Sequence, residues 1–255
     1  AATGYDIQVA TDNGFSNIIL NGLSVGNVLS YNVTSPPASQ ALTPNTSYYY
    51  RVRATNGSGI SAYSTGVPTI TLPVAPTANT PTRPTDVTET TFLASWSSSG
   101  TVTYLLDVST DNFSSFLPGY SGNMVTGSAT SKTVTGVPGG TRIYYRVRAS
   151  NSSGASVNSN APNFWTVLGT PVPNATSAVS ATGFTVSWPA VSGATSYRLD
   201  VSASNTFSPL VSGYGNLTVN GTSQVVSGLT AGSTYYYRVR AVNANETSPS
   251  SAAVM

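Results

Sequence analysis

One seven-residue block occurs three times in the chain, and it constrains the fold more than any other feature of the sequence. The block reads Tyr-Tyr-Tyr-Arg-Val-Arg-Ala at residues 48–54 and 235–241, and Ile-Tyr-Tyr-Arg-Val-Arg-Ala at residues 143–149. Between equivalent arginines the period is 95 and then 92 residues. This is the length of a whole domain and exceeds the roughly 20–50 residues of solenoid and propeller repeats. The sequence therefore predicts three similar domains in tandem.

Further landmarks keep step with this block and indicate repeated strands. A tyrosine-led segment of alternating residues stands ahead of each block, and such alternation is typical of β-strands. The three segments are residues 5–9, 104–108 and 197–201. Only the second and third repeats carry a tryptophan upstream of this segment, at Trp96 and Trp188. Because only four residues precede Tyr5, we expect the first repeat to lack two N-terminal strands.

An incomplete first repeat predicts that the sequence is a segment of a longer protein, because a sandwich without two of its strands exposes core and a sheet edge. Strand donation by a neighbouring subunit is the less favoured alternative, since the last repeat is complete and carries no spare strands. Prolines at both joints favour extended, semi-rigid connections. The expected units are a partial domain at 1–73 and full domains at 74–168 and 169–255.

Each full repeat contains about seven short strand-like runs separated by Gly, Pro, Asn and Ser turns. This pattern predicts an all-β chain of tandem, immunoglobulin-like Greek-key β-sandwiches. One family of such sandwiches has a Trp on its second strand, a Tyr on its third strand and a Tyr at the corner before its sixth strand. The third repeat matches these positions with Trp188, Tyr197 and Tyr235. On these residues the repeats resemble fibronectin type III domains, and the resemblance covers nearly the whole chain.

The second repeat departs from this family pattern at one position. Ile143 stands where the family has its corner tyrosine, whose hydroxyl ties down the chain as it crosses between the sheets. Isoleucine keeps the packing and loses that hydrogen bond. We therefore predict that the second domain is less stable than the third, and hydrogen exchange would test this.

The composition excludes several classes of function. The 255 residues carry a formal net charge of +2, with 10 Lys and Arg, 8 Asp and Glu, and neither Cys nor His. Nucleophilic triads, thiolate chemistry and His/Cys metal or haem sites therefore lack their residues, and we expect neither catalysis nor a cofactor. The few basic residues argue against nucleic-acid binding. No apolar run approaches the roughly 18 residues of a membrane span.

Period-two alternation divides the repeated block into an inner and an outer face. In the first repeat, Tyr48, Tyr50, Val52 and Ala54 are expected to face the core. The residues between them form three outward stripes, which are the candidate binding residues of the chain: Tyr49, Arg51 and Arg53; Tyr144, Arg146 and Arg148; Tyr236, Arg238 and Arg240.

These arginine stripes have two interpretations. A binding role would stack the stripes on sugars or pair them with an acidic partner. A structural role is favoured, because the neighbouring strand carries Gln8, Asp107 and Asp200 at outward positions that suit cross-strand pairing with arginine. The aliphatic arms of the arginines would also cover apolar surface.

Four acidic residues are further candidates. Asp12 and Asp111 stand at equivalent places where a calcium loop could be imagined, but the third repeat has Asn205 there and calcium needs several converging oxygens. A turn-forming role is favoured. Asp86 and Glu89 could form a carboxylate pair, yet the third repeat has no equivalent, so we interpret them as solvated loop charges.

The resemblance implies a structural and interaction protein. The modules look like repeats of large bacterial surface adhesins, stalks and extracellular fibres, with neighbouring repeats, self-assembly or an extracellular glycan or protein ligand as partners, at the cell surface or outside the cell. The alternative is an accessory to a secreted polysaccharide-degrading enzyme, as a carbohydrate-binding or linker module. Exposed aromatic residues would support it, and the candidates are Tyr49, Tyr120, Tyr144, Trp165, Tyr214 and Tyr236.

Overall fold

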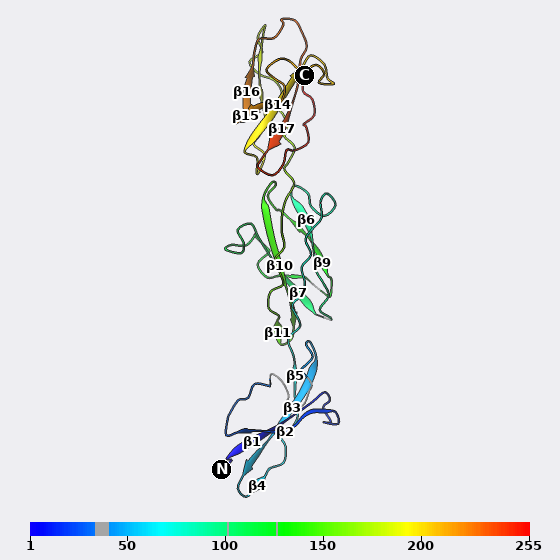
Figure 1. Ribbon diagram of the computed structural model, residues 1–255, viewed down its shortest axis with the longest axis vertical. Helices are drawn as coiled ribbons and strands as arrows, with labels where there is room; N and C mark the ends of the chain where they lie inside the picture. Colours follow the sequence, from blue (N-terminus) through cyan, green and yellow to red (C-terminus); the bar gives the residue numbers. More distant parts are fainter. Residues whose placement is uncertain (34–40, 101, 126) are drawn as a thin grey trace.

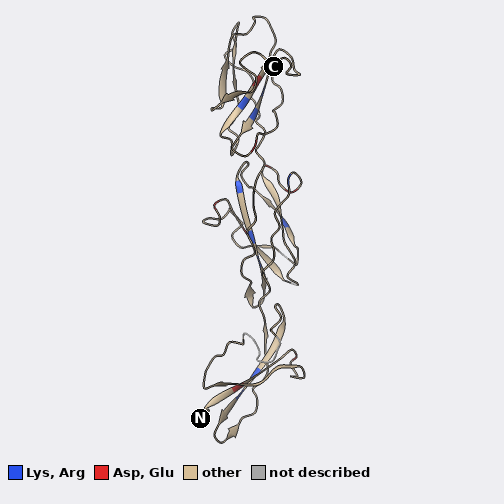
Figure 2. Cartoon of the chain, viewed as in Figure 1, with Lys and Arg blue, Asp and Glu red and all other residues tan. Residues whose placement is uncertain are grey.

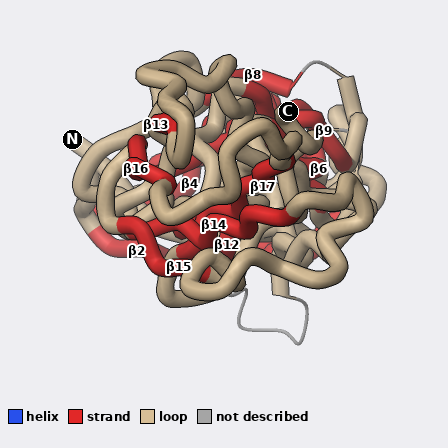
Figure 3. Tube along the Cα trace, turned by 90° about the horizontal axis from the view of Figure 1, so that it is seen from above, coloured by secondary structure: helices blue, strands red, loops and turns tan. Residues whose placement is uncertain are grey.

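The computed structural model describes residues 1–33, 41–100, 102–125 and 127–255, which form strands, turns and loops with no helix among them. Three groups of strands follow one another along the long axis, with the N-terminus at one end (Figure 1). Seen from above, the groups overlap within one outline (Figure 3). We call them module 1 (1–73), module 2 (74–168) and module 3 (169–255). The described part of the chain offers no helix capable of crossing a membrane.

Module 1 contains a single antiparallel sheet. Its strand order is β2-β1-β3-β4, and β5 also pairs with β3. The strands are β1 (Gly4–Ala10), β2 (Ile18–Gly26), β3 (Ser47–Asn56), β4 (Gly59–Ile60) and β5 (Val67–Ile70). Among the described residues of the module, no second sheet packs against this one.

Module 2 is a two-sheet sandwich. One sheet has the order β11-β10-β7-β8 with β12 added on β10, and the other pairs β6 with β9. The strands are β6 (Thr91–Ser95), β7 (Thr103–Ser109), β8 (Asn123–Val125), β9 (Ser131–Thr135), β10 (Arg142–Asn151), β11 (Gly154–Ala155) and β12 (Asn163–Trp165).

Module 3 repeats this architecture, except that the pairings equivalent to β11 and β12 are reduced to the single bridges Val242–Thr247 and Tyr237–Val254. One sheet has the order β15-β14-β17, and the other pairs β13 with β16. The strands are β13 (Phe184–Ser187), β14 (Ser196–Ser202), β15 (Leu217–Val219), β16 (Ser223–Val226) and β17 (Tyr236–Val242). The chain is therefore all-β, with β-sandwich modules arranged in tandem.

The cores of modules 2 and 3 lie between their two sheets and are built from equivalent residues. In module 2, Trp96 packs on Tyr104 with ring centroids 5.4 Å apart. In module 3, Trp188 packs on Tyr197 at 5.3 Å. Apolar residues at alternate positions of the facing strands bury most of the hydrophobic surface that drives folding.

The inner face of module 1 is less covered than its counterparts. Tyr50 and Val52, which alternation places on the core face, are 40% and 36% exposed. Their equivalents Tyr145 and Val147 in module 2 are fully buried. Tyr50 and Val52 line an apolar groove together with Ile7, Val9 and Tyr48, so they lie on the inner face as expected, and the described residues cover that face only in part.

The corner of each module is closed by a different set of hydrogen bonds. In module 1 the Thr43 N–H donates to the Tyr48 hydroxyl at 2.8 Å, and in module 3 the Thr230 N–H donates to Tyr235 at 3.1 Å. In module 2 the equivalent of Thr43 is Pro138, which has no N–H. Replacing the corner tyrosine by Ile143 therefore leaves no N–H group unpaired at this position, because Pro138 has none to donate.

Thr166 supplies a tie for the module 2 corner instead. Its Oγ1 accepts from the Thr141 N–H at 2.9 Å and donates to the Pro138 carbonyl at 2.7 Å. Thr71 makes the same two contacts in module 1, with Thr46 and Thr43. The lower stability expected of module 2 stays a prediction. The bonds of Thr166 stabilise the module 2 corner and would reduce the expected difference from module 3.

We expect the substitution Thr166→Val to destabilise module 2 by about 1–2 kcal/mol, because it leaves the partly buried Thr141 N–H without its acceptor. Hydrogen exchange of core amides on β7 and β10 would measure the change. Thr133→Val is the matched control, since Thr133 is exposed on β9. Equal protection in the two variants would contradict the role given to Thr166.

Candidate functional site

The arginine stripes lie on the outer faces of β3, β10 and β17. The strand register sets Arg146 opposite Asp107, Arg238 opposite Asp200, and Arg51 opposite Gln8. Charged residues are otherwise sparse over the three modules (Figure 2). The outer faces of the central strands are thus the main sites where opposite charges meet.

Asp107 is the centre of the module 2 stripe. It is only 2% exposed, and its Oδ2 accepts from Arg146 Nε at 2.9 Å. Its Oδ1 accepts from the Gly122 N–H at 2.5 Å and lies 3.6 Å from Arg148 Nη2. The carboxylate therefore contacts Arg146 and Arg148 of β10 as well as the loop that leads into β8.

Asp200 repeats this arrangement in module 3. Its Oδ2 accepts from Arg238 Nε at 2.9 Å and from Arg240 Nη2 at 3.3 Å, and its Oδ1 accepts from the Asn216 N–H at 2.7 Å. The same three kinds of contact thus recur around Asp107 and Asp200.

Module 1 distributes these contacts over two residues. Arg51 Nε donates to Gln8 Oε1 at 2.6 Å, and Arg53 Nε donates to Asp6 Oδ2 at 3.0 Å. Sequence reasoning missed Asp6. The signal was available, since Asp6 is also an outward residue of its strand and the register places it opposite Arg53.

A phenylalanine with left-handed backbone geometry stacks on the first arginine of each stripe. The φ angles of Phe15, Phe113 and Phe207 are 54°, 68° and 59°. The corresponding guanidinium carbons lie 4.0, 4.3 and 4.2 Å from the ring centroids. These cation–π contacts occupy one face of each guanidinium group. Each of these phenylalanines precedes a serine in the sequence, but the contact with arginine did not follow from spacing.

The tyrosines of the stripes are also partly engaged. Tyr49, Tyr144 and Tyr236 are half-buried, and Tyr144 meets the Phe113 ring edge-on at a centroid distance of 6.3 Å. With carboxylate or amide partners on one side and a phenylalanine on the other, the stripes are well suited to stabilising each sheet. Ligand binding by the stripes stays a prediction.

The other aromatic candidates divide into two groups. Tyr120 accepts from the Thr135 N–H at 3.0 Å, and Tyr214 accepts from the Ser227 N–H at 2.8 Å. Both hydroxyls therefore join a loop to the end of a strand in the opposite sheet. Trp165 is more open, with 38% exposure.

Asp12 and Asp111, the candidate calcium ligands, close turns. Asp12 accepts from the N–H groups of Ser16 and Asn17 at 3.0 and 2.6 Å. Asp111 accepts from the Ser115 N–H at 2.9 Å and from the Ser115 and Ser109 hydroxyls. These bonds lower the pKa of Asp111 to about 2, with the Ser115 hydroxyl as the largest cause. Across the described ranges, no three acidic side chains converge as a metal site would require.

Asp86 and Glu89 have different surroundings. Asp86 Oδ2 accepts from the Thr82 N–H at 2.9 Å and closes a turn ahead of β6. Glu89 is exposed at the protein surface, next to the backbone of Gly139 and Gly169.

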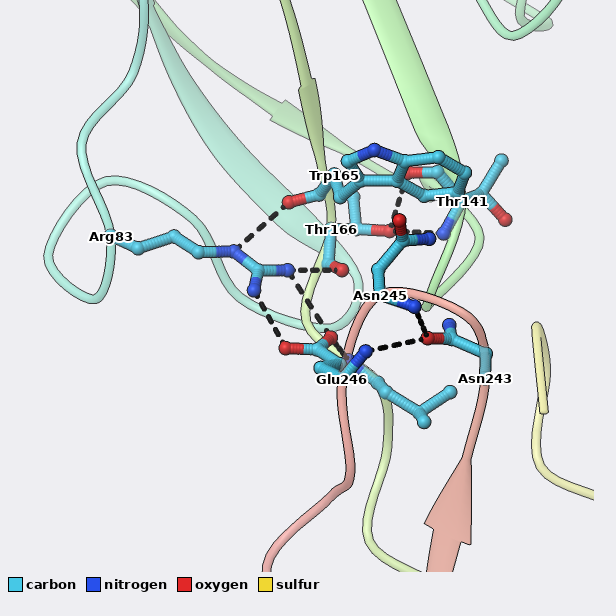
Figure 4. A network of polar contacts seen from close by, with 8 residues as sticks. Arg83, Thr141, Trp165, Thr166, Asn243, Asn245 and Glu246 are labelled. Atoms are coloured by element: carbon cyan, nitrogen blue, oxygen red, sulfur yellow. Dashed lines mark hydrogen bonds and ion pairs between the residues drawn. The ribbon is translucent and has the colours of Figure 1, made fainter. Parts of the chain in front are cut away.

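The contact between modules 2 and 3 forms a polar network that sequence reasoning missed (Figure 4). Arg83 of module 2 pairs with Glu246 of module 3, Nη1 to Oε2, at 2.7 Å. Glu246 Oε1 also accepts from the Leu168 N–H at 2.6 Å. Arg83 Nε donates to the Trp165 carbonyl at 3.0 Å, and its Nη2 donates to the Thr166 carbonyl. We call this contact joint 2–3.

The backbones of the two modules also approach closely at joint 2–3. A Cβ atom added at Gly193 would lie 2.6 Å from the Gly139 carbonyl and 2.8 Å from the Gly140 carbonyl. Gly193 also has a positive φ of 75°. A side chain at this position would therefore be strained and would push the modules apart.

The contact between modules 1 and 2, joint 1–2, uses asparagines. Asn151 Nδ2 donates to Asn45 Oδ1 at 3.0 Å and to the Thr71 carbonyl at 2.8 Å. Its Oδ1 accepts from the Ser153 N–H at 2.9 Å, which closes its own loop. Asn243, the equivalent residue of module 3, closes its loop in the same way at joint 2–3.

Comparison with known proteins identifies the fold. Residues 170–254, which form most of module 3, match the model of the family described as "Fibronectin type III domain". Module 3 therefore has the fold of a fibronectin type III domain. Modules 1 and 2 share its repeated sequence block.

Solved structures with tandem domains of this kind also resemble the chain. A two-domain fibronectin type III segment of chicken tenascin shares 22% identity with a TM-score of 0.46, and covers 70% of this chain and 95% of its own. The FN1–FN3 domains of chicken CNTN1 share 18% identity with a TM-score of 0.28, over 99% of this chain and 87% of their own. No curated protein sequence matches the chain.

We expect Asp200→Ala to destabilise module 3 by about 2 kcal/mol, because it removes three hydrogen-bonded contacts and leaves Arg238 without its carboxylate. Thermal unfolding followed by Trp188 fluorescence would measure the change. Asp200→Asn is the matched variant, since its amide oxygen can still accept from Asn216, and we expect a smaller loss. A change below about 0.5 kcal/mol for the alanine variant would contradict the structural role.

The lowered pKa of Asp111 gives a pH-dependent prediction. Its carboxylate is stabilised in the folded protein, so this contribution is complete above the ordinary pKa of 3.8 and is lost as the pH falls through about 2. Carbon-13 NMR titration of the Asp111 carboxyl group would follow the proton. Titration near 3.8 with loop 109–115 still ordered would contradict the hydrogen bonds assigned to this turn.

Proposed function

We propose that this chain is a non-catalytic spacer and interaction segment of a secreted or cell-surface protein, built from fibronectin type III modules in tandem. The observation that carries the proposal is the recurrence of one joint at equivalent positions. Asn45 and Gly140 occupy the same corner of modules 1 and 2, and each faces an asparagine loop of the module that follows. Such joints favour an extended chain of modules over independent domains on free linkers.

The charge distribution supports a display role. Most charged residues are used within the stripes or in joint 2–3, which leaves a surface of mainly uncharged side chains. A surface of this kind offers few charges for steering a substrate or for acid–base chemistry. It suits a segment whose task is to hold other domains apart.

Joint 2–3 is expected to be the stiffer of the two joints. The side chains of Arg83 and Glu246 are 37% and 23% exposed, so their ion pair alone is worth no more than about 1 kcal/mol. The added bonds to the Leu168 N–H and to two carbonyls hold both side chains in one geometry. Together with the close approach at Gly193, they restrict rotation of module 3 on module 2.

We expect Glu246→Ala to broaden the distribution of distances between modules 2 and 3, because it removes the ion pair and the bond to Leu168. The absence of cysteine allows spin labels at two introduced cysteines. Labels at the exposed strand positions 133 and 225 would report joint 2–3 by double electron–electron resonance.

Labels at positions 24 and 133 would report joint 1–2 in the same variant and serve as the control. This second distribution should not change, since Glu246 is remote from joint 1–2. A broad distribution across both joints in the unsubstituted chain would overturn the spacer proposal. Glu246→Gln should give an intermediate effect, because its amide oxygen can still accept from Leu168.

A further inference from the structure

Aromatic side chains form a row on the outer face of module 2. The rings of Phe116 and Phe113 have centroids 6.4 Å apart, and Phe113 meets Tyr144 at 6.3 Å. Trp165 of β12 extends the row, because the register sets it opposite Arg142 and opposite residues of antiparallel strands share a face. Phe116 and Trp165 are both 38% exposed. The row therefore presents ring surface to the solvent at each of its ends.

Arg142 lies within this row and has only one side of its guanidinium group occupied. Its Nε and Nη2 both donate to Asn163 Oδ1, at 3.0 and 2.6 Å, and its guanidinium carbon lies 5.4 Å from the centroid of the Tyr144 ring. The end formed by Nη1 and Nη2 still carries N–H donors. None of the ion pairs among the described residues includes Arg142. Asp111, in the loop that carries Phe113, uses its oxygens within its own turn.

The combination of rings and a free guanidinium end is particular to module 2. At the positions of Phe116 and Arg142 the other modules have aliphatic and hydroxyl side chains: Ile18 and Ser47 in module 1, Leu210 and Thr234 in module 3. The tyrosine and the stacked phenylalanine recur in all three modules as parts of the stripes. Phe116 and Arg142 are therefore additions that the shared sheet does not need.

We propose that the aromatic platform, formed by Phe113, Phe116, Arg142, Tyr144 and Trp165, binds a linear polysaccharide that contains uronic acid residues. The rings pack on the apolar C–H faces of the sugar rings. The free end of Arg142 donates one N–H each from Nη1 and Nη2 to a single carboxylate, which matches the planar fork of a guanidinium group. The inference rests on the interaction role proposed above and names its ligand class.

The size and charge of the platform favour an acidic sugar polymer over a protein. A stable protein interface buries about 800 Å² on each partner, whereas the platform is a single row on β10, β12 and the loop after β7. An acidic peptide could pair with Arg142, but it lacks the saturated rings that would pack on Trp165 and Phe116. A uronic acid polymer satisfies the rings and the guanidinium group with one repeating unit.

The test compares three probes by isothermal titration calorimetry with the full chain. They are a hexamer of β-1,4-linked glucuronate, the matched hexamer of β-1,4-linked glucose, and hexaglutamate. We expect the glucuronate hexamer to bind about tenfold or more tightly than the glucose hexamer, because only the former gives Arg142 a carboxylate. We expect no measurable binding of hexaglutamate. Amide chemical shifts should change on β10 and β12 and stay constant on β17.

Two variants separate the contributions of charge and rings. Arg142→Gln should remove the preference for glucuronate over glucose, since the neutral amide has no charge to offer a carboxylate. Trp165→Ala should weaken both hexamers by about three- to tenfold, because both lose a ring contact. Arg198→Gln is the matched control, since it removes one arginine from module 3, and its affinities should equal those of the unsubstituted chain.

The outcomes separate this inference from the proposed function. Failure of the glucuronate hexamer to bind at millimolar concentration would overturn the platform, as would affinities that neither Arg142→Gln nor Trp165→Ala changes. Hexaglutamate binding as tightly as the glucuronate hexamer would overturn it in favour of an acidic peptide.

The spacer role is measured independently of sugar binding. Trp165 borders joint 2–3, where its carbonyl accepts from Arg83 (Figure 4). Trp165→Ala keeps this carbonyl, so the distance distribution between labels at positions 133 and 225 should stay narrow. Loss of sugar binding with narrow distributions would overturn the platform alone. Broad distributions across both joints in the unsubstituted chain, with sugar binding intact, would overturn the spacer alone.

Discussion

A sheet with one apolar face has to cover that face, and each module is organised by this requirement. In modules 2 and 3, a two-stranded sheet lies over the inner residues of the central strands, so that Tyr145 and Tyr237 are fully buried. In module 1 the same alternation leaves Tyr50 at 40% exposure, because the described residues include no such sheet. The repeated block is thus the same piece of structure in two environments. Its inner face is most fully shielded from water where a partner sheet covers it, and in module 1 only part of it, around Ile7, Val9 and Tyr48, is buried.

The outer faces of the sheets have a different requirement, because their charged side chains must pair with one another and still contact water. Each stripe uses an acidic or amide partner opposite the arginine and a phenylalanine stacked on it, as with Asp107, Arg146 and Phe113. The arginine side chains stay about a quarter to a third exposed, which limits their desolvation cost. Asp107 and Asp200 are far more buried and also accept backbone N–H bonds, so the carboxylate is the residue that each stripe depends on.

The sequence predicts local strand patterning better than it predicts contacts between distant loops. Alternation around Arg146 and Arg238 placed them outward, and register made Asp107 and Asp200 their partners. Asp6 was overlooked although the same alternation applies to it. The ion pair of Arg83 with Glu246 could not be read from the chain, because it joins residues 163 positions apart and depends on how two modules meet. The replacement of a corner tyrosine by Ile143 was visible, but the matching loss of a donor at Pro138 became clear only when Thr166 was placed beside it.

The two joints differ both in the residue at the corner and in the chemistry of the contact. Asn45 has a side chain that reaches Asn151, so joint 1–2 is held by amide hydrogen bonds between uncharged groups. Gly140 has no side chain, which lets the backbone of Gly193 approach directly, and the polar contacts move outward to Arg83 and Glu246. Salt screens the second kind of contact and has little effect on the first. The left-handed corner therefore accommodates both asparagine and glycine, and joint 2–3, which contains the Arg83–Glu246 ion pair, is the joint expected to respond to ionic strength.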